Sequence, residues 1–289
     1  MEAAAEMSAA VSRVYSSESE LRHPRALASA LRRDAGEAFR LGWTLFRRDI
    51  SLQRRQAFLG ASWVLLPPVL LALTLRAAQE SQVFRIAPTE LHYPLYVILG
   101  MVFWQTFSDA LQAPIQGITS ARPFLGKIHF PREAIVVSKF YQSLLHLALK
   151  AFLVAGVFLW LETPLPAGAV WAAALVWPLL LLGMGLGMLL APLAVVFADI
   201  GKAASILSGV WFFLTPVIFP RPAEGLFGSL MRWNPVTPLL EACRDAVALG
   251  VPPQQPSWPF AAAAAAAAFI IGWLVYRLSL SFAVERSQS

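Results

Sequence analysis

The chain has 289 residues, of which 57% are hydrophobic and only 14% are charged, and its mean hydropathy is +0.60. A soluble protein of this size needs far more charge to cover its surface, so the composition excludes that class. The apolar residues fall in blocks long enough to cross a bilayer, which takes roughly 20 helical residues. The single cysteine, Cys243, excludes an intrachain disulfide and offers no thiolate cluster for a metal.

The net charge of +6 is concentrated in one basic N-terminal segment beside the first apolar block. Membrane topology explains that position better than nucleic-acid binding does. Residues 1–30 hold few large apolar side chains, and no apolar core follows the first methionine. We therefore expect a mobile cytoplasmic tail there and no cleaved signal peptide.

Residues 31–57 are predicted to form an amphipathic helix in the membrane interface. Large apolar side chains recur at helical spacing (Phe39, Trp43, Phe46 and Ile50), and arginines lie between them. This pattern places aromatic rings in the headgroup zone and arginines against lipid phosphates. The alternative is a solvated helix packed on a soluble partner, but the adjoining apolar block favours the interface.

An all-α membrane domain with six transmembrane helices is expected over residues 58–276. Pro67 and Pro68 should kink the first helix, since neither can donate a backbone hydrogen bond. The predicted spans cover about 58–75, 93–112, 134–161, 168–197, 203–219 and 259–276. Small residues that permit close contact between helices lie in the fourth and sixth spans, at Gly183, Gly185, Gly187 and the alanine run 261–268.

Residues 220–258 form a proline-rich extracellular segment before the last span. It contains two short helix-like pieces, about 224–233 and 237–249, and neither is long enough to cross a bilayer. Re-entrant half-helices buried in protein and a surface cap are both compatible with these lengths.

The orientation follows from the lysines and arginines. Ten arginines precede residue 58, and further basic residues lie in the polar segment 113–133. The positive-inside rule places both in the cytoplasm, and six spans return the C-terminus to the same side. Residues 277–289 are then a second cytoplasmic tail.

The polar segment 113–133 lies between two apolar blocks. It offers a surface to which a partner protein could bind and apply force. It ends in the sequence Phe130-Pro131-Arg132-Glu133, and its other basic side chains are Arg122, Lys127 and His129. We expect a short helix over about 113–127, interrupted near Pro123. The third span then starts after Pro131, with Glu133 near its positive end. The alternative is a tight turn with a snorkelling arginine.

Motifs of energy conversion or catalysis are missing from the sequence. Gly126-Lys127 lacks the upstream glycine and the following Ser or Thr of a phosphate loop. The four histidines are dispersed, and no His-Glu-x-x-His or paired-cysteine pattern occurs. ATP hydrolysis is therefore expected from a separate subunit, and no cofactor is expected in this chain.

Several short motifs occur in a characteristic order between about Arg48 and Gly250. They are Arg48-Asp49, Leu59-Gly60, Trp63, Pro68, Tyr93-Pro94-Leu95, Gly100, Trp104, Phe130-Pro131-Arg132-Glu133, Asp199-Ile200, Pro216-Val217-Ile218, Asn234-Pro235 and Arg244. In this order and spacing the chain resembles the permease subunits of ABC type-2 polysaccharide exporters, which export O-antigen, capsule or teichoic acid.

The resemblance implies a homodimer in the bacterial inner membrane that binds two copies of an ABC ATPase, which hold ATP and Mg²⁺. It also implies re-entrant helices before the last span and a lipid-linked glycan as substrate, with membrane lipids around the protein and no nucleic acid. The interfacial helix and the cytoplasmic loop would dock the ATPase. The expected coupling residues are Arg47, Arg48, Asp49, Arg122, Lys127, Phe130, Pro131, Arg132 and Glu133.

Two helix faces are candidates for the substrate path, because aromatic rings stack on sugars and hydroxyls exchange hydrogen bonds with them. The second span contributes Tyr93, Tyr96, Phe103 and Phe107; the fifth contributes Ser205, Ser208, Phe212, Thr215 and Phe219. Ordinary packing of the helices is the alternative for both faces; it is favoured for the second span and stands level with the substrate path for the fifth.

Lys150 lies deep inside the third span, on the same helical face as His146. A charge there costs roughly 2.5–3.5 kcal/mol on insertion scales, so Lys150 should face a partner or the path. Asp109 is a possible partner; a lysine that snorkels to the outer surface is the alternative.

Two other functions are compatible with this architecture. An ABC type-2 exporter of a drug or small lipid would have a narrower, more apolar path. An integral membrane enzyme that modifies lipids would need converging His, Asp or Glu side chains, which the sequence does not suggest.

Overall fold

The computed structural model describes residues 24–56, 60–81, 93–125, 131–222 and 224–288, and within these ranges the fold is helical with no strand. The predicted all-α class is confirmed. The helices are α2 (Pro24–Gln56), the 3-10 helix η2 (Gly60–Leu65), α3 (Leu66–Glu80), α4 (Tyr93–Leu125), α5 (Glu133–Trp160), η3 (Ala167–Ala169), α6 (Val170–Val196), α7 (Ile200–Phe213), α8 (Gly225–Trp233), α9 (Val236–Leu249) and α10 (Trp258–Gln288).

Within the described residues, three helical segments are long and apolar enough to cross a membrane: Glu133–Trp160, Ala167–Val196 and Trp258–Ser279. The middle segment, which contains α6, is the most buried of the three and packs mainly on α10 and α4. α6 is therefore the central helix of the bundle.

Alternate glycines of α6 face two different neighbours. A methyl group added at Gly183 or Gly187 would overlap the backbone of α4, at Phe107 or Leu111. The same group at Gly185 would overlap α10 at Ala268. The predicted close contacts are confirmed, because the missing side chains let two helix backbones touch α6 on opposite sides.

α4 differs from its prediction, because it runs unbroken through Pro114 to Leu125 and absorbs most of the expected short helix 113–127. Its 33 residues make a rod about 50 Å long. The buried ring of Pro114 lies against Gly187, which has no side chain to obstruct it. Packing therefore compensates for the backbone hydrogen bond that Pro114 cannot donate.

Other boundaries also differ from the sequence predictions. α2 begins at Pro24, so residues 24–30 of the expected tail are helical, and α10 runs through the expected C-terminal tail to Gln288. α7 ends at Phe213 and leaves the last six residues of the predicted fifth span in turns. The change from η2 to α3 lies immediately before the Pro67-Pro68 pair, where a kink was expected.

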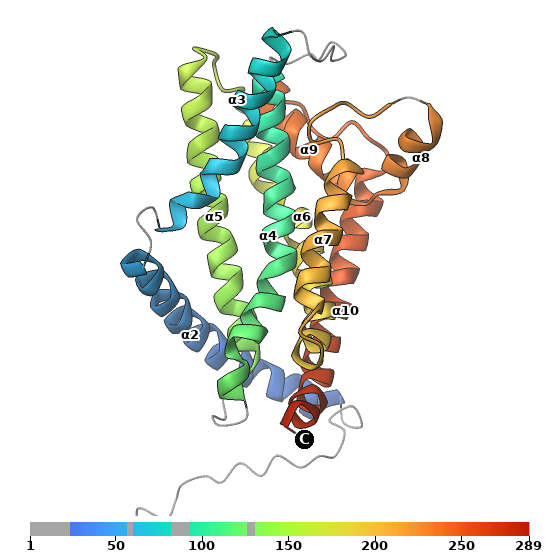
Figure 1. The fold of residues 1–289 in the computed structure, drawn as a ribbon. Coiled ribbons are helices and arrows are strands. Elements are labelled where there is room, and N and C mark those ends of the chain that lie inside the picture. The colour runs from blue at the N-terminus through green and yellow to red at the C-terminus, as the bar shows by residue number, and fades with distance from the viewer. Residues whose placement is uncertain (1–23, 57–59, 82–92, 126–130, 223, 289) are drawn as a thin grey trace, which may run out of the picture.

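Figure 1 shows α2, the start of α5 and the end of α10 gathered at one end of the bundle. α8 and α9 lie at the opposite end. α9 is largely buried in the bundle, whereas α8 projects from it and exposes Leu226, Leu230 and Trp233. The described part of the segment 220–258 thus holds one helix packed in the bundle and one that projects from it.

Candidate functional site

An ion pair and a hydrogen bond connect the N-terminus of α5 to the C-terminal half of α10. The carboxylate of Glu133 lies 3.3 Å from the guanidinium of Arg277. Next to this ion pair, the hydroxyl of the fully buried Tyr276 donates a hydrogen bond of 3.2 Å to the carbonyl oxygen of Arg132. Both contacts come from the first residues after Pro131, so the end of the polar loop is rigidly tied to the last helix.

α5 is also fastened to the N-terminal helix α2. Lys139 donates to Asp49 at 3.2 Å, and the same carboxylate accepts from Arg48 at 3.1 Å. Beside this charge cluster, the ring of Tyr141 packs edge-on against Trp43, with centroids 5.2 Å apart. Asp49 thus holds α2 to α5.

The predicted coupling residues occupy this end of the bundle as far as the structure describes them. Arg47, Arg48 and Arg122 are exposed, and Pro131 and Glu133 are half-buried. Lys127 and Phe130 lie outside the described residues. Lys139, Tyr276 and Arg277 were missed, because their partners are distant in sequence and no local pattern marks them.

An ion pair inside the bundle explains the lysine of the third span. Lys150 is 1% exposed, and its Nζ donates to Asp109 Oδ2 at 2.8 Å. His146 Nδ1 lies 3.6 Å from the same oxygen. The expected partner is therefore the observed one, and Lys150 faces α4 instead of an open surface.

The aromatic face predicted on the second span is part of the packed core. Tyr93, Tyr96, Phe103 and Phe107 are all buried. Phe107 packs on Trp211, with centroids 5.1 Å apart. The structure places these four rings among α6, α7 and α9, so in this protomer they pack helices together and leave no open face for a sugar.

Most of the predicted face on the fifth span also points inward. The hydroxyl of Ser208 donates to Ala204 O, and that of Thr215 donates to Trp211 O. Phe212 packs against Trp104, whereas Ser205 is exposed. Phe219 lies beyond the end of α7, against Phe227 of α8.

Asn234 links the end of α7 to the start of α9. Its amide nitrogen donates to Leu214 O and Thr215 Oγ1, both at 2.9 Å. Its amide oxygen accepts from Trp211 Nε1 and from the Val236 backbone, both at 3.0 Å. Three of these hydrogen bonds join the end of α7 and the turn after it to the junction between α8 and α9, and the fourth lies within the start of α9.

Arg244 completes this junction from α9. Its guanidinium donates to Pro216 O and lies over the ring of Tyr96, 3.9 Å from the centroid. Cys243 beside it is buried, and burial, with Asp245 adding to it, raises the pKa of the thiol well above its ordinary value. This thiol stays protonated and unreactive.

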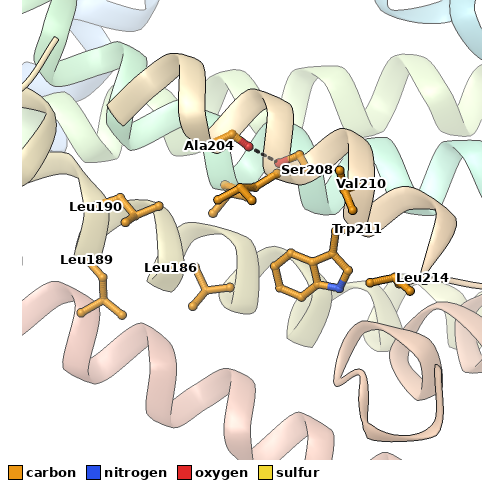
Figure 2. Close-up of a pocket in the computed structure, with 10 residues that line it drawn as sticks. Leu186, Leu189, Leu190, Ala204, Ser208, Val210, Trp211 and Leu214 are labelled. Atoms are coloured by element: carbon orange, nitrogen blue, oxygen red, sulfur yellow. Dashed lines mark hydrogen bonds between the residues drawn. The ribbon is translucent and has the colours of Figure 1, made fainter. Parts of the chain in front are cut away.

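Figure 2 shows an apolar cavity of about 460 Å³ between α6 and α7, with Leu111 of α4 also in its lining. Leucines dominate its walls, together with the ring of Trp211. The one hydroxyl in the lining, on Ser208, is already hydrogen-bonded to Ala204 O. A sugar placed here would leave its hydroxyls without partners, which is unfavourable.

Residues 40–247 match the protein family described as ABC-2 type transporter. The match covers well over half of the chain. The chain belongs to the ABC-2 type transporter family. It is therefore a subunit of a membrane transporter and not an enzyme, and the family implies a separate ABC ATPase as its partner.

Individual relatives of this ABC-2 chain have more specific names. It is 25% identical over 209 residues to the O-antigen export system permease protein RfbA of Myxococcus xanthus, covering 68% of this chain and 76% of that protein. It is 23% and 24% identical over 245 residues to two polysialic acid transport proteins KpsM of Escherichia coli. Those matches each cover 81% of this chain and 91% of KpsM.

Proposed function

We propose that this chain is the membrane-spanning permease of an ATP-driven exporter that carries a lipid-linked polysaccharide from the cytoplasm across the bacterial inner membrane. The observation that carries the proposal is the similarity to an O-antigen export permease over 68% of this chain and to a polysialic acid transport protein over 81% of it. Within an ABC-2 architecture, a glycan polymer is the cargo that both names share.

The proposed topology has six spans, α3, α4, α5, α6, α7 and α10, with both termini in the cytoplasm. The grouping of α2, the start of α5 and the end of α10 at one end of the bundle supports it (Figure 1). The ten arginines before residue 58 support the same orientation through the positive-inside rule.

The proposed assembly contains two copies of this chain and two ATPase subunits. α7 supports a second copy, because it exposes Ile206, Leu207, Val210 and Phe213 along one side and packs only lightly on its own bundle. ATP and Mg²⁺ would be held by the ATPase subunits, and this chain would need no cofactor.

The coupling surface is proposed to be the cytoplasmic end built from α2, the residues after Pro131 and α10. The ion pairs Asp49–Lys139 and Glu133–Arg277 support this role, because they join α5 to α2 and to α10. α5 itself begins where the loop ends. A push on the loop would then move α5 together with its two neighbours.

A second candidate function is export of a drug or small lipid. The apolar cavity between α6 and α7 favours it, because its lining suits a hydrocarbon. The two functions make opposite predictions for a strain that lacks this gene.

The test is deletion of the gene and staining of intact cells for surface polysaccharide. The proposed function predicts that polysaccharide disappears from the surface, accumulates inside the cell and returns when the gene is supplied on a plasmid. Unchanged surface polysaccharide, with a new sensitivity to apolar drugs, would support the second candidate instead.

A further inference from the structure

One face of α4 is polar in the part of the helix that follows Trp104. From Tyr93 to Trp104 almost every residue is buried, whatever its direction. From residue 105 to residue 120, every position that is not buried carries a polar side chain, except Ala113. We define the α4 polar face by five of these residues: Gln105, Ser108, Asp109, Gln112 and Gln116.

The spacing makes this a single stripe. Gln105, Asp109, Gln112 and Gln116 follow each other at intervals of four, three and four residues, which is the repeat of one helix face. α3 packs on α4 only along the upper part of the helix in Figure 1, above this stripe. α5 covers one edge of the stripe, at Asp109, and the other residues of the polar face stay half-buried or exposed.

Part of the stripe lies at membrane depth. A crossing takes roughly 20 helical residues, which counted from Tyr93 end near Gln112. Gln116 then lies on the cytoplasmic side, and Gln105 lies about halfway across. Amides and a carboxylate are unfavourable against lipid tails, so this face meets water, another protein or a polar ligand.

The polar face also has unused hydrogen-bonding groups. Among the residues that the structure describes, no partner reaches Gln105 Oε1 or Gln112 Nε2, although both atoms are buried. One is an acceptor and the other a donor, and they lie about two helical turns apart. Both side chains are half-buried and can rotate, so a ligand that both donates and accepts would satisfy these two atoms.

The charged side chains along the α4 polar face limit the chemical class of ligand that it can bind. Lys150 is buried and its charge is matched by Asp109, whose side chain is 36% exposed. Among the described residues, Lys150 and His146 both lie against Asp109, so the stripe offers a phosphate no unpaired cation. A hydrocarbon would leave the amides without partners, whereas sugar hydroxyls donate to the carboxylate and exchange hydrogen bonds with the amides.

We infer that the α4 polar face binds the neutral, hydroxyl-rich stretch of the exported glycan as it enters from the cytoplasm, with the Asp109–Lys150 pair near the middle of this contact. The inference rests on the proposed function and names the surface that the sugar touches. It assigns the contact to hydrogen bonds on α4 instead of aromatic stacking.

The experiment is site-specific photocrosslinking in cells that contain the ATPase partner. A benzophenone amino acid replaces Gln105 or Gln112, and the matched control carries it at Ala148, an exposed residue of α5 near the depth of Lys150. After irradiation, the purified chain is oxidised with periodate and probed with a hydrazide for attached carbohydrate. Carbohydrate is expected at positions 105 and 112 and not at 148.

Three results overturn the inference. The first is an adduct between two chains at position 112, which would show that a second copy covers the face. The second is as much carbohydrate at position 148 as at positions 105 and 112. The third is no carbohydrate at any of the three positions. Deletion of the gene remains a separate test, since lost surface polysaccharide without an adduct at 105 or 112 refutes this inference and leaves the proposed function standing.

Labelling of single cysteine variants is a second test, because cysteine is smaller than the benzophenone amino acid and less prone to disturb the fold. Gln112→Cys is treated in inside-out vesicles with a charged, membrane-impermeant maleimide, and Ala148→Cys serves as control. The native Cys243 is buried and stays unlabelled. Labelling at 112 and not at 148 is expected, and an unlabelled Gln112→Cys also overturns the inference.

Discussion

At the scale of single residues, the buried polar groups that matter most in this protein have partners on other helices. Lys150 reaches α4, Asn234 reaches the end of α7, and Tyr276 reaches the start of α5. Such contacts fix the mutual position of helices whose apolar surfaces alone slide easily past each other. These contacts give the clearest point-mutation predictions.

The Asp109–Lys150 pair should respond asymmetrically to neutralisation. Asp109→Asn leaves a 1% exposed lysine without its countercharge, whereas Lys150→Met leaves a carboxylate that is partly exposed. We expect Asp109→Asn to lose about 3 kcal/mol of stability and Lys150→Met clearly less. Unfolding of the purified variants in mixed micelles measures both, and equal losses would contradict the buried position of Lys150.

Asn234→Ala should loosen the extracellular end of the bundle. The change removes four hydrogen bonds and leaves Trp211 Nε1 and the Val236 amide without their acceptor. A loss of about 2–3 kcal/mol is expected from buried groups left unsatisfied. Thermal unfolding in detergent tests it; Gln254→Ala, on an exposed side chain of the same segment, is the control and should change little.

At the scale of elements, the close packing of α6 depends on glycines, which have no side chain to hold the neighbouring helices away. Its neighbours touch its backbone on two sides, which is why the bundle closes around it. Gly183→Ala or Gly187→Ala should therefore push α4 away, and a loss of about 1–3 kcal/mol is expected from overpacking.

Two other glycines provide matched controls for this prediction. A methyl group added at Gly156 or Gly209 meets nothing within 4 Å. Alanine at these positions should leave stability unchanged or raise it by up to about 1 kcal/mol, since alanine favours helix. Thermal unfolding ranks the four variants, and an equal loss in all of them would contradict the packing described for α6.

The sequence predicted the helical class and the glycine contacts of α6, because composition and small-residue spacing are local signals. It also paired Lys150 with Asp109, since few other charges lie at that depth. It did not predict that α4 continues through Pro114, because that depends on Gly187 of another helix. For the aromatic face of α4 it favoured helix packing over a substrate path, and those rings are buried; it did not single out the polar face of the same helix.

At the scale of the whole molecule, we propose that the end formed by α2, the start of α5 and the end of α10 connects the ATPase to the spans. Ion pairs tie α5 to α2 and to α10 there. A force applied at the loop is therefore shared by three helices.

If the ion pair between Asp49 and Lys139 carries the coupling, exchanging the two charges should restore export that either single reversal impairs. Asp49→Lys alone should weaken coupling, because Lys139 then faces a like charge, and Lys139→Asp alone should do the same. The double swap should restore much of the export, since the pair is re-formed with reversed sign. Surface polysaccharide per cell is the readout, and a double variant as defective as the singles would show that this ion pair does not carry the coupling.

Reversing charge at Arg122 and Lys127 tests the docking surface itself. Arg122 is exposed at the end of α4 and Lys127 follows it in sequence, so both should meet acidic or polar groups of the ATPase. The variant Arg122→Glu/Lys127→Glu should insert normally but lose ATPase in co-purification. Normal ATPase binding together with normal export would remove these residues from the docking contact.

The most direct test of the central proposal is reconstitution. Vesicles are prepared with the purified chain, its co-encoded ATPase and radiolabelled lipid-linked glycan extracted from the same cells. The ATPase is loaded so that its nucleotide sites face outward, and glycan protected from external glycosidase is counted over time. Protection that rises only with ATP and with both proteins is predicted. Equal protection without this chain, or robust ATP hydrolysis by this chain alone, would contradict it.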